Sequence, residues 1–574
     1  MTFRVKPVGR PGRSDREYGD RRTFLVNVGF TVAIALSLLI LVGYAGWSWW
    51  DDHNGRAATV NGVTLTKDDL RERYQVELFR LDYTRARIEY LKTLGRVSES
   101  DAAQQLAFLD QRLQQLPTIT LGRIVDIELQ SQLASQSNIT VSQAEVDAEF
   151  LKEKTIPEER HVWVIEVAPA TDPKTGEPGD AEKAAAKATA NGALAQLRAG
   201  KSWDEVAKAI STASSAPQAG DLGWAEQESS LDPAFADATF SVDVNTPTAV
   251  VEGADGIFRI GRATEIAPSS VDTTYEDQLD SRNIKLADYM AAVRADVIRQ
   301  KLDDMVVADL SKPGPQRHVL QIYIPAPSTP LPDGVKVRHI LFSPKDDPAG
   351  AADLAPDDPA WKTAEDEARA AYDTLKKDIS KFDEMARTLS DESSARDSGG
   401  KLPFYDGTST IDPAFSLAIL ANGLKPGDLL EPVKSAFGWH VIQFMRPYGD
   451  GDEAWLKSVR DQILGGADFG AAARDQGEGA EAAKGGDIGW VAKGVLDKAK
   501  ETPIFAAGIG GITDIVAVAS DGVYLWKVLA EEVRPPSDAD IAVFKSSGFQ
   551  DWYSDQYTKA KVDVDATSAA VLTN

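Results

Sequence analysis

One three-part pattern recurs at three places in this 574-residue chain, and it limits the folds that the chain can adopt. Each copy has a glycine-rich turn, a short segment that ends in phenylalanine, and a small-residue turn that leads into an apolar strand. The glycine-rich turns read GDLGW at 220–224, GGKLPFY at 399–405 and GGDIGW at 485–490. Three elements that recur in one order are typical of a repeated supersecondary unit. We therefore expect three α+β modules.

The other two parts of the pattern follow each turn in the same order. The phenylalanine-ended segments are DPAF from Asp232, DPAF from Asp412 and TPIF from Thr502, and the strands begin at Ala254, Ala436 and Ser520.

The third copy lacks a strand directly before its helix, whereas the first two copies open with one. The opening strands are RHVWVIEVAPA from Arg160 and VKVRHILFSP from Val335. A strand like the first, RHVLQIYIPAP, occurs earlier in the chain, from Arg317. We expect this strand to belong to the third copy, with the middle copy inserted between the two parts.

An uncharged run of 23 residues, Phe24–Gly46, is long enough to cross the roughly 30 Å hydrocarbon layer of a membrane as a helix. Basic residues precede it, and three tryptophans and two aspartates follow. The positive-inside rule then places the N-terminus in the cytoplasm and residues 51–574 outside. A cleaved signal peptide is the alternative, although the run is long for one and its cleavage pattern is poor.

Composition excludes several kinds of site. The chain has no cysteine, so disulfides, thiolate metal sites and a cysteine nucleophile are excluded. The net charge is −26, while the first 22 residues carry +4, which leaves −30 on the rest. Such an acidic surface repels phosphates, so we do not expect nucleic acid as a partner.

Three stretches are predicted to be helical: 57–156, 275–311 and 549–560. In the first of them, Asn61-Gly62 indicates a turn, and Thr66 with Asp69 three residues later is typical of a helix N-terminus. These stretches show no catalytic motif, and we expect their amphipathic helices to pack on one another.

The middle copy resembles the parvulin family of prolyl isomerases over its whole length. The matching signals are VRHILF, a helix, LSDESSARDSGGKL, DPAF and PVKSAFGWHVIQF. The helical stretches resemble the chaperone domains of SurA- and PrsA-type foldases, and the membrane helix before them resembles the PpiD arrangement.

The resemblance implies an α+β chain with one complete parvulin module and two degenerate ones. Its expected domains are a cytoplasmic tail at 1–23, a transmembrane helix at 24–46, a helical chaperone domain at 57–156 joined by 272–316 and 537–565, a first module at 157–268, a middle module at 335–447, and a third module formed by 317–327 with 452–533.

The resemblance also assigns site residues to the middle module. His339 and His440 match the paired histidines of the family, and Glu392 stands where relatives have Cys or Asp. This departure keeps an acid but lengthens its side chain. The expected substrate-binding side chains are Leu402, Ile411 and Phe415, which match the apolar cradle for proline, with Ser435 and Phe437 on the same pocket.

These residue types suit isomerisation of an X–Pro bond, whose rotation barrier is about 18–20 kcal/mol. No covalent bond to the substrate is needed, because the enzyme has only to bind the twisted amide better than either planar form. An apolar slot fixes the proline ring, and nearby polar groups adjust the charge distribution of the amide.

Other interpretations of these residues stay open. The two histidines can serve a structural or tuning role rather than transfer protons, and Phe415 can be ordinary core. A metal site formed by His339, Glu392 and His440 is disfavoured, because its ligands come from separate segments. We expect no metal and no cofactor.

The outer modules lack part of this cluster. The position of His440 is predicted to hold Phe258 in the first module and Tyr524 in the third. The position of Glu392 is predicted to hold Ala213 and Glu478.

The first-strand histidine is ambiguous in both outer modules. The preferred matches to His339 are Val164 and Gln321, and a shifted alignment would substitute the nearby His161 and His318. Since the second histidine is absent in either register, we expect both outer modules to be inactive or weak as isomerases.

We therefore expect a membrane-anchored isomerase and chaperone, whose partners are unfolded exported polypeptides containing X–Pro bonds. The loop after the first strand of the middle module, from Lys345, is acidic, so phosphorylated substrates are disfavoured. A holding chaperone without catalysis and a tether protein at the translocation exit are the alternatives. A hydrolase is disfavoured, because no nucleophile motif is present.

Overall fold

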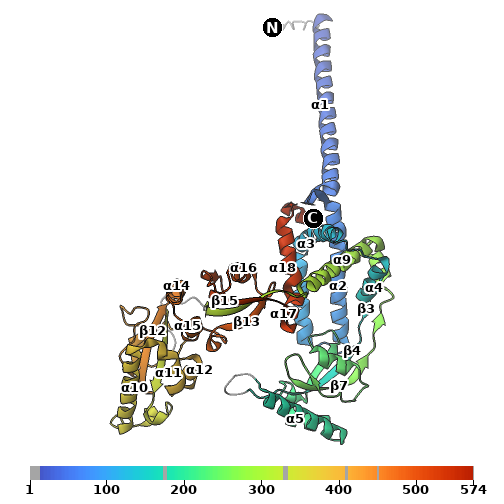
Figure 1. Cartoon of the computed structure of the whole chain (residues 1–574). Helices are drawn as coiled ribbons and strands as arrows, with labels where there is room; N and C mark the ends of the chain where they lie inside the picture. Colours follow the sequence, from blue (N-terminus) through green and yellow to red (C-terminus); the bar gives the residue numbers. More distant parts are fainter. Residues whose placement is uncertain (1–12, 172–177, 327–333, 408–410, 449–450, 573–574) are drawn as a thin grey trace, which may run out of the picture. The chain divides into compact units, whose positions relative to one another are not determined.

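The computed structural model describes residues 13–171, 178–326, 334–407, 411–448 and 451–572 (Figure 1). The chain forms two compact units. These units are Met1–Leu302 with Ser554–Asn574, and Asp303–Tyr553. Residues 1–12, which include half of the predicted cytoplasmic tail, lie outside the described residues.

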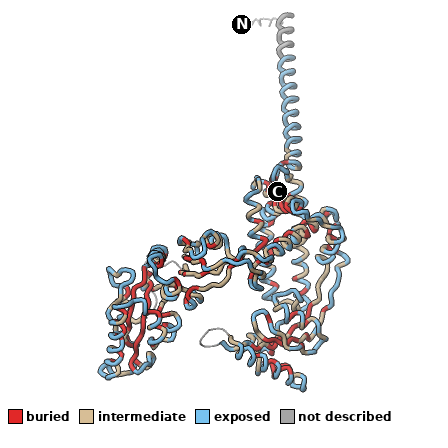
Figure 2. Tube along the Cα trace, in the orientation of Figure 1, coloured by how far each residue is buried: buried red, intermediate tan, exposed pale blue. Residues whose placement is uncertain are grey.

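Helix α1 (Arg13–Asn54) contains the predicted membrane segment. Its part from Phe24 to Asn54 is long and apolar enough to cross a membrane and buries none of its most apolar stretch in the protein. Figure 2 shows the helix exposed along its described length. A membrane anchor and a signal sequence both have these properties.

The domain after α1 begins with strands rather than with the predicted helix. Strands β1 (Arg56–Val60) and β2 (Val63–Thr66) form an antiparallel hairpin. The prediction of helix from residue 57 was therefore wrong for this segment, because alternating β-branched residues on both sides of Asn61-Gly62 favour a hairpin. The hairpin also pairs with β16 (Val562–Val564), close to the end of the chain.

The predicted helix start at Thr66 is confirmed. Thr66 caps helix α2 (Lys67–Thr93) with its side chain, and the Asp69 carboxylate accepts a hydrogen bond from the Thr66 N–H at 2.7 Å. This reciprocal pair satisfies two backbone donors that the first helical turn would otherwise leave without partners.

Helices from distant parts of the chain share one core in this domain. They are α2, α3 (Glu99–Gln136), α4 (Gln143–Glu153), α8 (Tyr275–Ser281) and α9 (Leu286–Leu310). An aromatic cluster of Phe79, Phe150, Tyr275 and Tyr289 joins α2, α4, α8 and α9. In the same domain, the Arg80 guanidinium pairs with Glu153 at 2.7 Å. The helical domain is therefore assembled from segments on both sides of the first module.

The first module is a four-stranded antiparallel sheet with helices. Its strand order is β5–β4–β7–β6, from Asp221–Glu226, Glu159–Val167, Phe258–Ala267 and Val251–Glu252. Its helices are α5 (Asp180–Arg198), α6 (Trp203–Ile210) and α7 (Pro233–Phe240), and the two-stranded ribbon of β3 (Thr155–Ile156) and β8 (Ser270–Val271) adjoins it in sequence.

The middle module has the same plan with a three-stranded antiparallel sheet, β10–β12–β11. These strands are Val335–Phe342, Trp439–Pro447 and Val433–Lys434, and the helices are α10 (Pro359–Lys377), α11 (Phe382–Leu389), α12 (Ser393–Ser398) and α13 (Pro413–Ile419). Val335 lies opposite Pro447 in the register, so the chain enters and leaves this module at neighbouring points.

The third sheet has the order β13–β9–β15–β14 and includes a strand from before the middle module. Strand β9 (Gly314–Pro325) pairs with β13 and, over its whole length, with β15, and not with the sheet of the middle module. The remaining elements are β13 (Asp487–Ala492), β14 (Val516–Val518), β15 (Gly522–Arg534), α14 (Gly451–Leu464), α15 (Phe469–Gln476), α16 (Lys498–Ala506), α17 (Asp538–Val543) and α18 (Phe549–Lys559).

Buried charges join the middle module to the elements that follow it. Arg338, which has no exposed surface, pairs with Asp475 on α15. Glu478 accepts from Lys336 at 2.9 Å and from Arg446 at 2.9 Å. Because buried charges are costly without partners, this network fixes the two modules against each other.

We expect Asp475→Asn to destabilise this unit by about 3–5 kcal/mol, since it leaves the Arg338 guanidinium buried without a counter-charge. Urea unfolding of the full chain in detergent measures the change. Asp514→Asn is the control, because Asp514 pairs with Arg460 while its side chain is 94% exposed, and it should change stability by less than about 1 kcal/mol. Equal unfolding midpoints for the two variants would contradict the interpretation.

Candidate active site of the middle module

Two adjacent strands bring the paired histidines together. His339 on β10 lies opposite Ile442 on β12, and His440 lies opposite Leu341, so the two histidines are diagonal neighbours on one face of the sheet. Their Nδ1 atoms are 3.0 Å apart, and their rings stack with centroids 5.2 Å apart. Both side chains are buried.

This contact limits the protons that the pair can carry. Two ring nitrogens 3.0 Å apart form a hydrogen bond only if one carries a hydrogen and the other presents a lone pair. Burial, together with the neighbouring His339, lowers the pKa of His440 to about 3. His440 is therefore neutral at physiological pH.

Glu392 completes the predicted polar cluster. It precedes α12, and its carboxylate lies 3.2 Å from Nε2 of His339, within ion-pair distance but off the line of a hydrogen bond. This contact and a hydrogen bond donated by the Ser394 hydroxyl lower the pKa of Glu392 to about 2, against the opposing effect of partial burial. The carboxylate is therefore ionised, and it favours a hydrogen on the Nε2 atom of His339.

Ser435 contacts the far side of the histidine pair. Its Oγ lies 2.7 Å from Nε2 of His440 and accepts a hydrogen bond from the N–H of Phe437 at 3.0 Å. The side chain of Phe437 is 47% exposed at the turn between β11 and β12. A continuous polar chain thus runs from Ser435 through both histidines to Glu392.

The apolar side chains lie beside the histidines. The ring of Phe415, on α13, makes edge contacts with His339 and His440 at centroid distances of 5.3 and 4.9 Å. Half-buried Leu402 and Ile411 pack on the same cluster as Phe415. All eight predicted site residues are thus placed in or next to one region, with Phe415 both in the core and against the histidines.

Sequence reasoning missed Asp412. It caps α13 by accepting from the N–H groups of Ala414 and Phe415, and it also accepts from the N–H of Ala436 at 3.0 Å. It therefore ties the helix that carries Phe415 to the hairpin that carries Ser435. The recurrence of Asp-Pro-Ala-Phe at Asp232, which makes the same two kinds of contact in the first module, is the signal that would have found it.

Among the residues that the structure describes, no group of three or more His, Asp or Glu side chains is arranged to hold a metal ion.

Comparison with known families identifies the modules. Two family models, each described as a PPIC-type PPIASE domain, match this chain: one at residues 339–446 and again at 452–529, the other at residues 149–264. Together these segments cover more than half of the chain. The chain belongs to the PPIC-type parvulins. The segment from 452 lacks an opening strand, and β9 supplies one to its sheet.

Individual relatives are SurA- and PrsA-like foldases. A foldase protein PrsA of Latilactobacillus sakei is 36% identical over 134 residues, which are 22% of this chain and 37% of the relative. A chaperone SurA of Nitrosospira multiformis is 24% identical over 54% of this chain and 52% of its own length. The crystal structure of PrsA from Bacillus subtilis aligns with 42% of this chain and 89% of its own at 21% identity, with a TM-score of 0.15. The matches span less than two thirds of either sequence relative.

Backbone hydrogen bonds settle the register of the first strand in these parvulin modules. The N–H of His339 donates to Gly400, and in the same way Val164 donates to Gly220 and Gln321 donates to Gly486. Val164 and Gln321 therefore occupy the position of His339, and the shifted alignment was wrong.

The displaced histidines make a different contact. His161 and His318 each lie 2.8 Å from an aspartate on the neighbouring strand, Asp221 and Asp487 respectively. These contacts join the edge strand of each outer sheet to the strand beside it.

The position of His440 differs from the prediction in one outer module. In the third, Tyr524 is opposite Val516, as His440 is opposite Val433, so that prediction is confirmed. In the first module the position holds Arg259 rather than Phe258. The hairpin closes between Gly253 and Ile257, one residue longer than the Ser435–Gly438 turn, and so shifts the strand by one. Arg259 pairs with Glu166 and Asp255.

The position of Glu392 also required one correction. The N–H of Asp391 donates to Leu341, and the N–H of Glu478 donates to Tyr323 in the same way. Glu478 therefore matches Asp391, and Gly479 stands where Glu392 does. In the first module Thr212 makes the equivalent contact with Glu166, so Ala213 is placed as predicted.

The third module replaces the key phenylalanine with a lysine. Asp497 caps α16 as Asp412 caps α13, five residues before the predicted Thr502, so Lys500 takes the position of Phe415. Its ammonium lies 2.5 Å from Asp521 and 5.0 Å from the centre of the Tyr524 ring. An ion pair thus occupies the place of the apolar slot.

The lowered pKa of His440 predicts that acid destabilises the middle module. The unfolded chain protonates this side chain below about pH 6.5, whereas the folded chain does so only near pH 3. Stability should therefore fall as pH drops below about 6.5, by roughly 1.4 kcal/mol per pH unit from this group. Glu392 adds to the loss in the same direction below about pH 4.3.

Urea unfolding of the full chain at pH 7 and pH 5 measures this dependence. His440→Gln removes the titrating group and should show a shallower loss than the unchanged chain. Equal losses in both proteins would show that His440 protonates normally in the folded state.

Proposed function

We propose that this chain is a prolyl isomerase and chaperone for exported polypeptides, and that catalysis resides in the middle module alone. The observation that carries the proposal is the combination of His339, His440 and Glu392 with an apolar slot at one place. Neither outer module combines these features, since their equivalent positions hold Val164, Ala213 and Arg259, or Gln321, Gly479 and Tyr524.

The apolar side chains hold the proline ring in this mechanism. Phe415 contacts both histidines, while Leu402 and Ile411 are half-buried and border the same cluster. A ring held there fixes one side of the X–Pro amide while the preceding residue rotates. The dry surroundings disfavour the charge-separated planar amide relative to the twisted one, which lowers the barrier.

The polar chain keeps one arrangement of hydrogens around the slot. Ionised Glu392 favours a hydrogen on Nε2 of His339, so Nδ1 of His339 accepts from His440, and Nε2 of His440 accepts from Ser435. Each group in this chain then donates its hydrogen to the next group in the direction of Glu392. This arrangement needs no proton transfer to the substrate. The histidines act on the amide through the fixed positions of their donor hydrogens and acceptor lone pairs.

The acidic loop after β10 favours unphosphorylated clients. The first 15 residues after Ser343 hold five aspartates and one lysine, and they would repel a phosphate group. We further propose that α1 stays in the membrane as a single anchor, with the N-terminus in the cytoplasm and the modules outside. The outer modules then have a structural role and do not catalyse isomerisation.

The catalytic proposal predicts the effect of Phe415→Ala in the full chain. Removing the ring leaves the proline without one wall of its slot, so kcat/KM for a proline peptide should fall by roughly ten- to a hundredfold, the loss expected for 1.4–2.8 kcal/mol of transition-state binding. A protease-coupled or NMR exchange assay measures it. Leu417→Ala is the matched control, because Leu417 lies on the same helix with 78% exposure, and it should keep full activity.

Glu392→Gln tests the role of the charge in the polar cluster. It retains shape but removes the charge, so kcat/KM should fall. The unfolding midpoint at pH 7 should also fall, because the folded chain stabilises the ionised carboxylate. If the unchanged chain does not accelerate isomerisation but suppresses client aggregation, the holding chaperone replaces the isomerase as the function.

A further inference from the structure

Three successive backbone N–H groups in the turn between β11 and β12 have fixed acceptors. The N–H of Ser435 donates to the carbonyl of Gly438 at 2.8 Å, and the N–H of Phe437 donates to Oγ of Ser435 at 3.0 Å. Between them, the N–H of Ala436 donates to Oδ2 of Asp412 at 3.0 Å. Of these three acceptors, only the carboxylate of Asp412 lies outside the turn.

The other oxygen of Asp412 holds the helix that carries Phe415. Oδ1 accepts from the N–H groups of Ala414 at 2.8 Å and Phe415 at 3.3 Å, in the first turn of α13. Burial raises the pKa of Asp412, but the backbone donors outweigh burial and hold the pKa below its usual value. The carboxylate is thus ionised, and each of its oxygens accepts from a different element.

Both elements that Asp412 joins contact His440. Oγ of Ser435 lies 2.7 Å from Nε2 of His440, and the centre of the Phe415 ring lies 4.9 Å from the centre of the imidazole. Because the histidine is fixed on β12, a shift of the helix relative to the turn would change one of these distances. One carboxylate therefore controls how the apolar slot and the polar chain meet at this imidazole.

The first module has the same contact without the serine. Asp232 accepts from the N–H of Phe235 at 3.1 Å and from the N–H of Ala254 at 3.0 Å. The residue before Ala254 is Gly253, so no hydroxyl stands at the place of Ser435. The aspartate contact thus belongs to the shared fold, whereas the hydroxyl that it holds in place is particular to the middle module.

The third module joins the helix to the turn with a different side chain. Asp497 accepts from the N–H of Lys500 at 3.2 Å, and the Lys500 ammonium pairs with Asp521 in the turn before β15. Of the three modules, only the middle one has a histidine on the strand after this turn.

We propose that Asp412 is a positioning residue for prolyl isomerisation and acts through Ser435. By holding the N–H of Ala436, it keeps the Ser435 hydroxyl on Nε2 of His440 while the Phe415 ring stays against the same imidazole. The proposal rests on the isomerase function proposed above. It gives the Asp-Pro-Ala-Phe segment of the middle module a role in the reaction that the same segment lacks in the first module.

Asp412→Ser separates the two contacts of the carboxylate. Serine is a good helix N-cap, so Phe415 keeps its place, but the serine side chain is too short to reach Ala436. We expect kcat for a proline peptide to fall roughly two- to tenfold with little change in KM, the loss expected for one hydrogen bond. Isomerisation assays on the full chain in detergent, at several peptide concentrations, measure both constants. Asp412→Asn repeats the test with the size of the side chain kept, because an amide nitrogen at the place of Oδ2 cannot accept from Ala436.

A double-mutant cycle with Ser435→Ala distinguishes positioning from a separate structural role. If Asp412 acts through Ser435, the variant that carries both Asp412→Ser and Ser435→Ala should have the same kcat as Ser435→Ala alone. Full multiplication of the two single losses would overturn the proposal, as would an unchanged kcat in either single variant.

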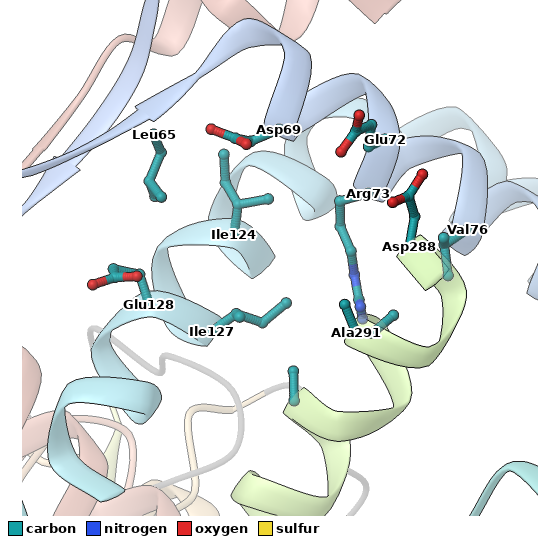
Figure 3. A pocket seen from close by; sticks show the side chains of 12 residues that line it. Leu65, Asp69, Glu72, Arg73, Val76, Ile124, Ile127, Glu128, Asp288 and Ala291 are labelled. Carbon is teal, nitrogen blue, oxygen red and sulfur yellow. The ribbon is translucent and has the colours of Figure 1, made fainter. Parts of the chain in front are cut away.

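Two further variants control for loss of stability. Asp232→Ser removes the matching contact from the first module and should keep full activity. Ile124→Ala removes buried methyl groups from the helical domain, where Ile124 lines the cavity between α2, α3 and α9 (Figure 3). It should lower the unfolding midpoint and leave kcat unchanged. If either control lowers kcat as much as Asp412→Ser does, the effect is one of stability and the proposal fails.

The ¹⁵N chemical shift of Nε2 of His440 gives a measurement that does not depend on catalysis. The chain has five histidines, and His440→Gln identifies the signal. The signal should move in Asp412→Ser in the same direction as in Ser435→Ala, and it should not move in Asp232→Ser. If the signal stays in place while the unchanged chain isomerises proline peptides, the positioning proposal alone fails. If the signal moves but the unchanged chain has no isomerase activity, the proposed function fails while the contact of Asp412 with the turn stands.

Discussion

The pairing of β9 with β15 is the interaction on which the carboxyl-terminal half of the molecule depends. Twelve residues of β9 align with β15, although the whole middle module lies between them in sequence. Because the middle module begins and ends at the paired residues Val335 and Pro447, it can be inserted without opening that sheet. Buried charges around Arg338 and Glu478 then hold the inserted module against its host.

The three sheets share one plan but carry different chemistry, because different residues occupy a small number of key positions. The strand position that holds His339 in the middle module holds Val164 or Gln321 in the others, and the helix position of Phe415 holds Lys500 in the third. Polar groups were also redistributed. Where the outer sheets have a histidine–aspartate pair at their edge, the middle module has Lys336 and Lys401, and Lys336 binds Glu478 beyond the module.

Much of this arrangement could be predicted from sequence, because glycine turns and strand patterns mark each module. The histidine pair was predictable from its place on two strands, and Thr66 from its capping partner. The errors arose where loop length, not pattern, sets the register. One additional hairpin residue moved Arg259 into the place assigned to Phe258. Contacts between modules, such as Arg338 with Asp475, were not predictable, because no local pattern encodes a partner about 140 residues away.

The separation of β9 from its partners has a consequence for synthesis. The chain grows from its N-terminus, so β9 emerges before the middle module, whereas β13 begins only at Asp487. The middle module is then complete and able to fold while β9 still lacks its partner strands. In the folded molecule Val319, Ile322 and Ile324 of β9 have no exposed surface, but at this stage they are uncovered. The chain therefore passes, during its own biogenesis, through an intermediate with an unpaired apolar strand, the kind of species that aggregates unless another protein covers it.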